Sequence, residues 1–162
     1  MIKETIQDAI NRQINRELYS AYLYTAMSAY FETLPLRGAA KYMRVQANEE
    51  RTHAMKFFDY IIERGGIVKL TAIETPPFKW ESPLKAFEEA YKHEQKVTGW
   101  INDLVNLAIK EQDHATNNML QWFVKEQVEE EANAALVVEK IKMLGPEGHA
   151  FLWLDHELGK RE

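Results

Sequence analysis

Glutamate and histidine recur along this chain at spacings that suit metal binding. Six polar residues form two sets of three with the same spacing. Each set begins with a glutamate, and its second and third residues follow 33 and 36 positions later. The sets are offset by 77 residues: Glu17, Glu50 and His53 in the first half, and Glu94, Gln127 and Glu130 in the second. This repeated spacing predicts a duplicated helical hairpin. Carboxylates and an imidazole are ligands for Fe²⁺ or Mn²⁺, and Zn²⁺ competes for such sites.

Hydrophobic periodicity places these polar residues on the inner faces of helices. Apolar residues recur at alternating steps of three and four, which is typical of helices packed in a bundle. Each of four expected inner faces carries one glutamate near its middle. The faces are Ile6, Ile10, Gln13, Glu17, Ser20, Tyr24, Met27 and Phe31; Met43, Ala47, Glu50, Ala54, Phe57 and Ile61; Leu84, Phe87, Tyr91, Glu94, Thr98, Ile101, Val105 and Ala108; and Leu120, Phe123, Gln127, Glu130, Ala134, Val137, Ile141 and Leu144.

Four enclosed carboxylates require compensating positive charge. A buried carboxylate without a partner is costly, and neighbouring carboxylates repel one another or take up protons. The expected inner faces contain no lysine or arginine. Two divalent cations would balance the four negative charges. The sequence therefore predicts a pair of metal ions at mid-bundle.

Composition narrows the class of protein. The 162 residues, of which 46% are hydrophobic, suit one domain spanning 1–162. The absence of cysteine excludes disulfides, thiolate metal sites and iron–sulfur clusters. A net charge of -5 argues against nucleic-acid binding. The N-terminus lacks a secretory signal, and no apolar run approaches the roughly 18 residues that span a bilayer, so we expect a soluble cytoplasmic protein without a membrane partner.

Glycine and proline divide the chain into five expected helices, with no pattern for β-strands. We expect an all-α fold: a four-helix bundle over about 5–144, a crossover over about 66–82 and a short C-terminal helix over about 148–158. Ser82 and Pro83 suit the start of the third helix, and Gly65-Gly66 and Gly145-Pro146 suit helix ends. Fifteen extended residues reach roughly 50 Å, enough for the crossover to follow the full length of the bundle.

This arrangement resembles the non-haem ferritins over essentially the whole chain. Ferritin-like di-iron sites use a glutamate from each of two helices and two Glu-x-x-His motifs, of which this sequence keeps only Glu50-x-x-His53. The pairing with Gln127-x-x-Glu130 is similar to the asymmetric centre of bacterial-type non-haem ferritins. The resemblance implies a first iron at Glu17, Glu50 and His53, with Glu50 bridging to a second iron at Glu94 and Glu130. Gln127 would be a neighbouring hydrogen-bonding group.

The resemblance also implies a function. The family oxidises Fe²⁺ with dioxygen or hydrogen peroxide and deposits a ferric mineral inside a shell of 24 identical subunits, which stores iron and limits its toxicity. The short C-terminal helices would meet around fourfold axes of the shell, and the crossover, with Phe78 and Trp80, would contribute to a twofold interface. The expected apolar excess of the last helix comprises Phe151, Leu152, Trp153, Leu154 and Leu158.

Further residues are candidates for supporting roles. Tyr24 and Trp122 could supply an additional electron. Glu49, Glu126 and Glu129, together with Glu130, resemble the third iron site of bacterial ferritins, although a run of acids is also typical of a solvated helix face.

Histidines outside the two motifs carry no comparable pattern. His93, His114, His149 and His156 are expected to be exposed or to cap helices. No haem is expected, because Arg51 stands where a bacterioferritin-like haem would need a methionine.

Two other classes of function remain open at this point. One is a non-storage di-iron or di-manganese oxidase or peroxidase, such as a rubrerythrin-like peroxidase or a manganese catalase. The other is a noncatalytic shell protein whose acids only template mineral or fix the fold.

Overall fold

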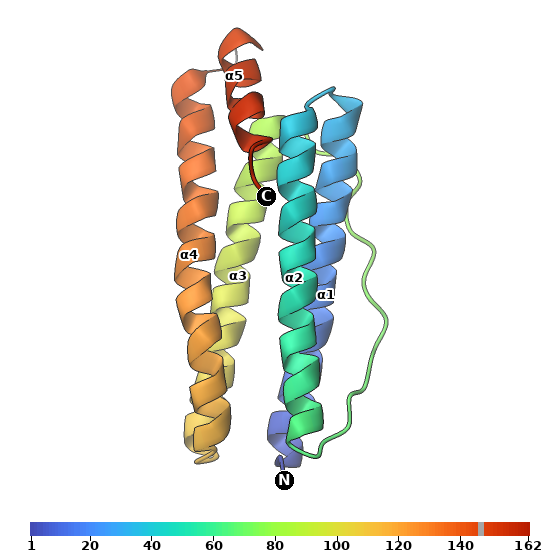
Figure 1. The fold of residues 1–162 in the computed structure, drawn as a ribbon, viewed down its shortest axis with the longest axis vertical. Coiled ribbons are helices and arrows are strands. Elements are labelled where there is room, and N and C mark those ends of the chain that lie inside the picture. The colour runs from blue at the N-terminus through green and yellow to red at the C-terminus, as the bar shows by residue number, and fades with distance from the viewer. Residues whose placement is uncertain (146–147) are drawn as a thin grey trace.

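The computed structural model describes residues 1–145 and 148–162, which form five α-helices and no strand (Figure 1). The helices are α1 (Glu4–Thr33), α2 (Arg37–Glu63), α3 (Pro83–Lys110), α4 (His114–Leu144) and α5 (Gly148–Leu158). The predicted all-α class is confirmed. Pro146, part of the expected stop after the fourth helix, lies outside the described residues.

Local sequence signals account for the helix ends. Ser82 Oγ accepts a hydrogen bond from the backbone N–H of Lys85 at 3.2 Å, so the predicted cap of α3 is confirmed. Asp113 caps α4 in the same way, accepting from the backbone N–H of Thr116 at 3.0 Å. Gly65 ends α2 with a φ of +69°, a left-handed conformation that glycine adopts without a steric penalty.

The four long helices pair as two antiparallel hairpins, α1 with α2 and α3 with α4, and the segment between α2 and α3 runs along the bundle (Figure 1). Asn11 on α1 fixes this crossover: its Nδ2 donates to the carbonyl of Ile67 at 3.0 Å, and its Oδ1 accepts from the backbone N–H of Lys69 at 2.8 Å. Asn15 Nδ2, one turn further on, donates to the carbonyl of Ala72 at 3.0 Å. The crossover therefore lies along α1, a contact that the sequence did not specify.

A polar layer separates two apolar regions of the core. One region includes Ile10, Phe57 and Phe123, and the other includes Phe31 and Phe87. The layer between them holds the four inner-face glutamates, which break the apolar seams at one level. Side chains on both sides of the layer are buried, so the polar groups are shielded from solvent along the bundle axis.

The buried face of α3 differs from the predicted one. Tyr91, Thr98 and Val105 are only half-buried, whereas the residues one position earlier, Ala90, Val97 and Leu104, are buried. The reason is that α3 packs against α1 as well as α4, which turns its buried stripe.

This rotation also buries His93, which is 6% exposed. The expectation that His93 is exposed or capping was wrong. His93 Nε2 forms a 2.7 Å hydrogen bond with Ser20 Oγ on α1, and burial lowers the pKa of His93 to about 4. The other three histidines outside the motifs, His114, His149 and His156, are exposed.

Helix α5 packs back onto its own bundle near the start of α2 (Figure 1). Leu154 and Leu158 are buried there, and only Leu152 and Trp153 of its large apolar residues are strongly exposed. The expected apolar excess of this helix is therefore partly used inside the subunit. Asp155 supplies the cap that α2 lacks locally: its carboxylate accepts from the backbone N–H groups of Gly38 and Ala39 at 3.1 and 2.7 Å.

Replacing Gly38 by alanine should loosen α5. A Cβ at this position would lie 1.7 Å from the carbonyl oxygen of Asp155, so the backbones of α2 and α5 would have to separate. We expect a loss of about 2 kcal/mol of stability from this overpacking, measured by thermal unfolding. Gly99→Ala is the matched control, because a Cβ on Gly99 meets nothing within 4 Å. Equal unfolding midpoints for the two variants would contradict the close approach of α5.

Candidate metal centre

Each of the four long helices contributes one glutamate to a single buried level of the bundle. These are Glu17 from α1, Glu50 from α2, Glu94 from α3 and Glu130 from α4, and none is more than 5% exposed. His53, one turn beyond Glu50, and Gln127, one turn before Glu130, are buried beside them. The structure thus brings together the six residues of the two spaced sets.

The candidate ligand atoms form two overlapping groups. Glu17, Glu50 and His53 each offer an atom within 4.8 Å of the others, and so do Glu50, Glu94 and Glu130. Glu50 belongs to both groups. A carboxylate with two oxygens is able to connect two cations, so this geometry suits a pair of metal ions rather than one.

Neutral amides orient the carboxylates. Gln13 Nε2 donates to Glu17 Oε1 at 2.8 Å, and Gln46 Nε2 donates to Glu50 Oε1 at 3.1 Å. Gln46 also donates to Glu130 Oε2 at 2.7 Å, which links α2 to α4. Such contacts fix ligand orientation without adding charge.

Sequence reasoning placed Gln13 on an inner face without a role and missed Gln46 altogether. A signal was present, because each glutamine stands four residues before a ligand glutamate, on the same helical face, and the two are 33 residues apart.

Two groups hold Glu94. The phenol of Tyr24 donates to its Oε1, and Gln127 Nε2 donates to its Oε2 at 3.1 Å. Tyr24 is fully buried, in the position expected from its place on the α1 face. Gln127 has the hydrogen-bonding position that the resemblance implied, and it also donates to the backbone carbonyl of Glu94 at 3.2 Å.

Some buried ligand oxygens have no hydrogen-bond donor among the described residues. These are Oε2 of Glu17 and Oε2 of Glu50, the latter 3.4 Å from Nδ1 of His53. Leaving a buried acceptor unsatisfied costs free energy. A cation placed between these oxygens and the imidazole would satisfy them, so the residues present fit a bound metal ion.

The pKa values of the buried glutamates also fit a site for cations. Burial, and then repulsion by Glu50, raises the pKa of Glu17 well above its usual range; burial, and then repulsion by Glu94, does the same for the pKa of Glu50. The pKa of Glu130 rises to about 7, because of burial first and the charge of Glu94 second. Protons therefore compete with cations for the cluster, and cations replace them as pH rises.

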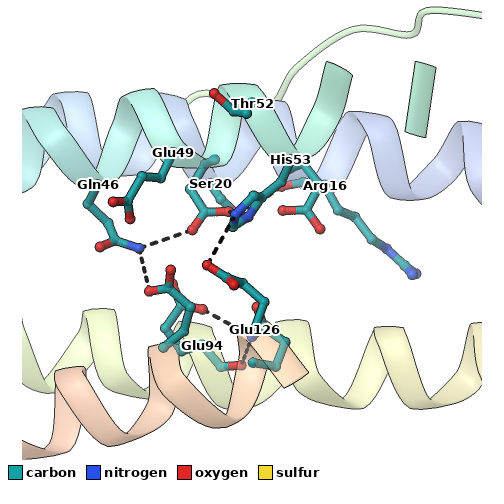
Figure 2. Close-up of polar contacts among 12 residues, drawn as sticks. Arg16, Ser20, Gln46, Glu49, Thr52, His53, Glu94 and Glu126 are labelled. Atoms are coloured by element: carbon teal, nitrogen blue, oxygen red, sulfur yellow. Dashed lines mark hydrogen bonds and ion pairs between the residues drawn. The ribbon is translucent and has the colours of Figure 1, made fainter. Parts of the chain in front are cut away.

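A third group lies beside the first two. His53, Glu126 and Glu130 offer atoms within 4.8 Å of one another, and His53 Nε2 and Glu126 Oε1 face each other at 3.9 Å (Figure 2). Glu49 and Glu129 belong to none of the groups. Glu129 is exposed, and Glu49 pairs with Arg161 at 2.7 Å. Of the three additional acids, only Glu126 lies with Glu130.

Trp122, the other candidate for electron donation, lies at the edge of the centre. Its ring centroid is 5.4 Å from that of His53, in an edge-to-face arrangement, and the side chain is 39% exposed. The residue thus packs against His53, a candidate ligand.

Comparisons with known proteins agree with this geometry. The family model described as a ferritin-like domain matches residues 7–144. The chain is 46% identical to the bacterial non-heme ferritin of Bacteroides fragilis (strain 638R). The aligned 161 residues cover 99% of this chain and 100% of the relative. The bacterial non-heme ferritin of Escherichia coli O157:H7 is 39% identical over 158 residues, 98% of this chain and 96% of the relative. The chain belongs to the ferritin family.

Solved ferritin structures share the fold of this family member closely. An open pore ferritin from the hyperthermophilic archaeon Archaeoglobus fulgidus superposes with a TM-score of 0.99 at 54% identity, with 100% of both chains covered. The ferritin family binds iron, and the buried carboxylate and imidazole groups described above suit that metal. Iron storage is therefore the function of this ferritin-family protein. Among the described residues, no helix has the length and apolarity needed to cross a membrane.

Proposed function

We propose that the protein is a ferroxidase that binds two Fe²⁺ ions per subunit as substrates. Glu17, Glu50 and His53 would hold one ion, and Glu50, Glu94 and Glu130 the other. The observation that supports this proposal best is the membership of Glu50 in both ligand groups at complete burial. Four carboxylates balance two dications, so the loaded centre carries no net charge inside the bundle.

The centre would oxidise the two ions together. Two Fe²⁺ supply two electrons, which with two protons reduce one dioxygen to one hydrogen peroxide; hydrogen peroxide is the alternative oxidant. The residues contribute orientation and proton acceptors. Gln13 and Gln46 each donate a hydrogen bond to one oxygen of their partner carboxylate, Glu17 and Glu50, and would fix its orientation toward the ions. Tyr24 would help to orient Glu94 toward the second ion, because its phenol donates a hydrogen bond to this carboxylate.

The ferric product would then pass into the interior of a shell of 24 subunits in the cytoplasm. Exposed large apolar side chains on the crossover and on α5 suit contacts between subunits, among them Phe78 at 79% and Trp153 at 59% exposure. The group of His53, Glu126 and Glu130 would be a third cation site next to the pair.

Particle size and iron capacity test this function. The native particle is sized by light scattering and then titrated aerobically with Fe²⁺. We expect a large homo-oligomer that takes up many more than two iron ions per subunit and keeps them in solution as a ferric mineral. A small species that saturates at two ions per subunit would refute storage and favour a di-iron oxidase or peroxidase. A large shell that loads iron only at the rate of oxidation in buffer would favour a noncatalytic role.

A further inference from the structure

Arg161 lies next to the metal centre although it is distant from it in the sequence. Its Nη2 donates to Glu49 Oε2 at 2.7 Å, and its guanidinium is 4.4 Å from the centroid of the Tyr42 ring. Nη1 is buried without a hydrogen-bond partner among the described residues, and the side chain is 20% exposed. The arginine is therefore enclosed between a carboxylate and an aromatic ring rather than free in solvent.

Both contacts of Arg161 belong to residues that adjoin the centre. Glu49 precedes the shared ligand Glu50 on α2 and stands beside Gln46 (Figure 2). Tyr42 lines a small void of about 20 Å³ together with Glu94 and Glu130. The guanidinium thus places a fixed positive charge at the border of a strongly anionic cluster.

The position of Arg161 is fixed by the docking of α5. Asp155 caps the start of α2, and the missing side chains of Gly38 and Gly159 allow the two backbones to approach; a Cβ on Gly159 would lie 3.1 Å from the Cα of Gly38. Arg161 follows two residues after Gly159. The packing of α5 against the start of α2 therefore places the Arg161 guanidinium beside Glu49.

Glu49 is the acid that this arrangement removes from the centre. His53, Glu126 and Glu130 form a possible third cation group, and Glu49 is not part of it despite its place beside Glu50. Metal binding through Glu49 Oε2 would have to break its charge-assisted hydrogen bond with Arg161. We propose that Arg161 is a positioning residue that withholds Glu49 from the third cation site, so that a cation there competes with the arginine. This inference rests on the proposed function and concerns only the third cation.

Zinc binding to the iron-free assembly tests the competition, because Zn²⁺ takes the same ligands without oxidation. Isothermal titration would compare wild type, Arg161→Gln, Glu49→Gln and the double variant. Lys160→Gln is the matched control, since the exposed Lys160 forms an ion pair with Glu157 and with no other described residue. We expect Arg161→Gln to tighten the weakest zinc site about fivefold, the size set by a partly exposed ion pair. The gain should vanish in the double variant and be absent in Lys160→Gln.

Two outcomes would overturn the inference. One is an unchanged third affinity in Arg161→Gln, and the other is a gain that survives the loss of Glu49. Glu49→Gln alone tests the same point without disturbing α5: it should leave the weak site within twofold of wild type, and a larger loss would mean that Glu49 is already a ligand. Tight binding of the first two Zn²⁺ ions, and its loss in Glu50→Gln, reports on the proposed function separately.

Discussion

Glu50→Gln should slow Fe²⁺ oxidation by at least about a hundredfold while the assembly stays intact. Glu50 is the one residue shared by the two ligand groups Glu17–Glu50–His53 and Glu50–Glu94–Glu130, so its loss weakens both cation positions at once. Glutamine keeps the shape and the hydrogen bond with Gln46 but lacks the charge. The rate would be measured by stopped-flow absorbance of the ferric product at equal subunit concentration, with particle size measured on the same sample.

His53→Ala tests a smaller loss. Of the two groups proposed to hold the iron pair, His53 belongs only to Glu17–Glu50–His53, whereas Glu50 belongs to both. His53→Ala should therefore slow oxidation less than the change at Glu50. Glu139→Gln is the matched control, since this glutamate is exposed on α4 and, within residues 1–145 and 148–162, pairs only with Lys142. Unchanged rates for Glu50→Gln and His53→Ala in an intact assembly would remove the ferroxidase proposal and leave a noncatalytic shell.

The iron-free protein should become less stable as pH rises from about 5 to 7, and Glu130→Gln should remove part of that loss. The folded state holds a proton on Glu130 up to about pH 7, whereas the unfolded chain releases it near 4.5. This stabilising contribution is complete below pH 4.5 and is lost as pH rises through 7. The difference corresponds to about 3 kcal/mol for this one group. Unfolding midpoints of both proteins would be compared at pH 5, 6, 7 and 8 at one subunit concentration.

The advantage of Glu130→Gln should therefore grow with pH and level off above pH 7. Added Zn²⁺ should reverse the order at pH 7, because cations stabilise the ionised cluster of the wild type and bind the variant less well. Glu139→Gln again serves as the control for loss of one surface charge. Parallel pH curves for wild type and Glu130→Gln would show that the carboxyl of Glu130 is not perturbed by its burial.

Helical periodicity explains how much of the centre was accessible from the amino-acid sequence. Glu17, Glu50 and Glu130 each interrupt an apolar stripe of period 3.6, and the side chain's face on a helix is a local property of spacing. Glycine and proline signals are local too, which is why the division of the chain into five helices was predicted. The pairing of Glu50-x-x-His53 with Gln127-x-x-Glu130 was visible for the same reason.

Contacts between helices could not be predicted from the sequence and became known only from the tertiary structure. They depend on how far each helix is rotated about its axis and on which segments pack against it. The rotation of α3 toward α1 buries His93, and no spacing within α3 specifies that rotation. Gln46 reaches from α2 to Glu130 on α4, and Arg161 reaches Glu49 across 112 residues of sequence. Spacing along one helix assigns each glutamate to a face, whereas packing between helices decides which carboxylates lie together and which one pairs with an arginine.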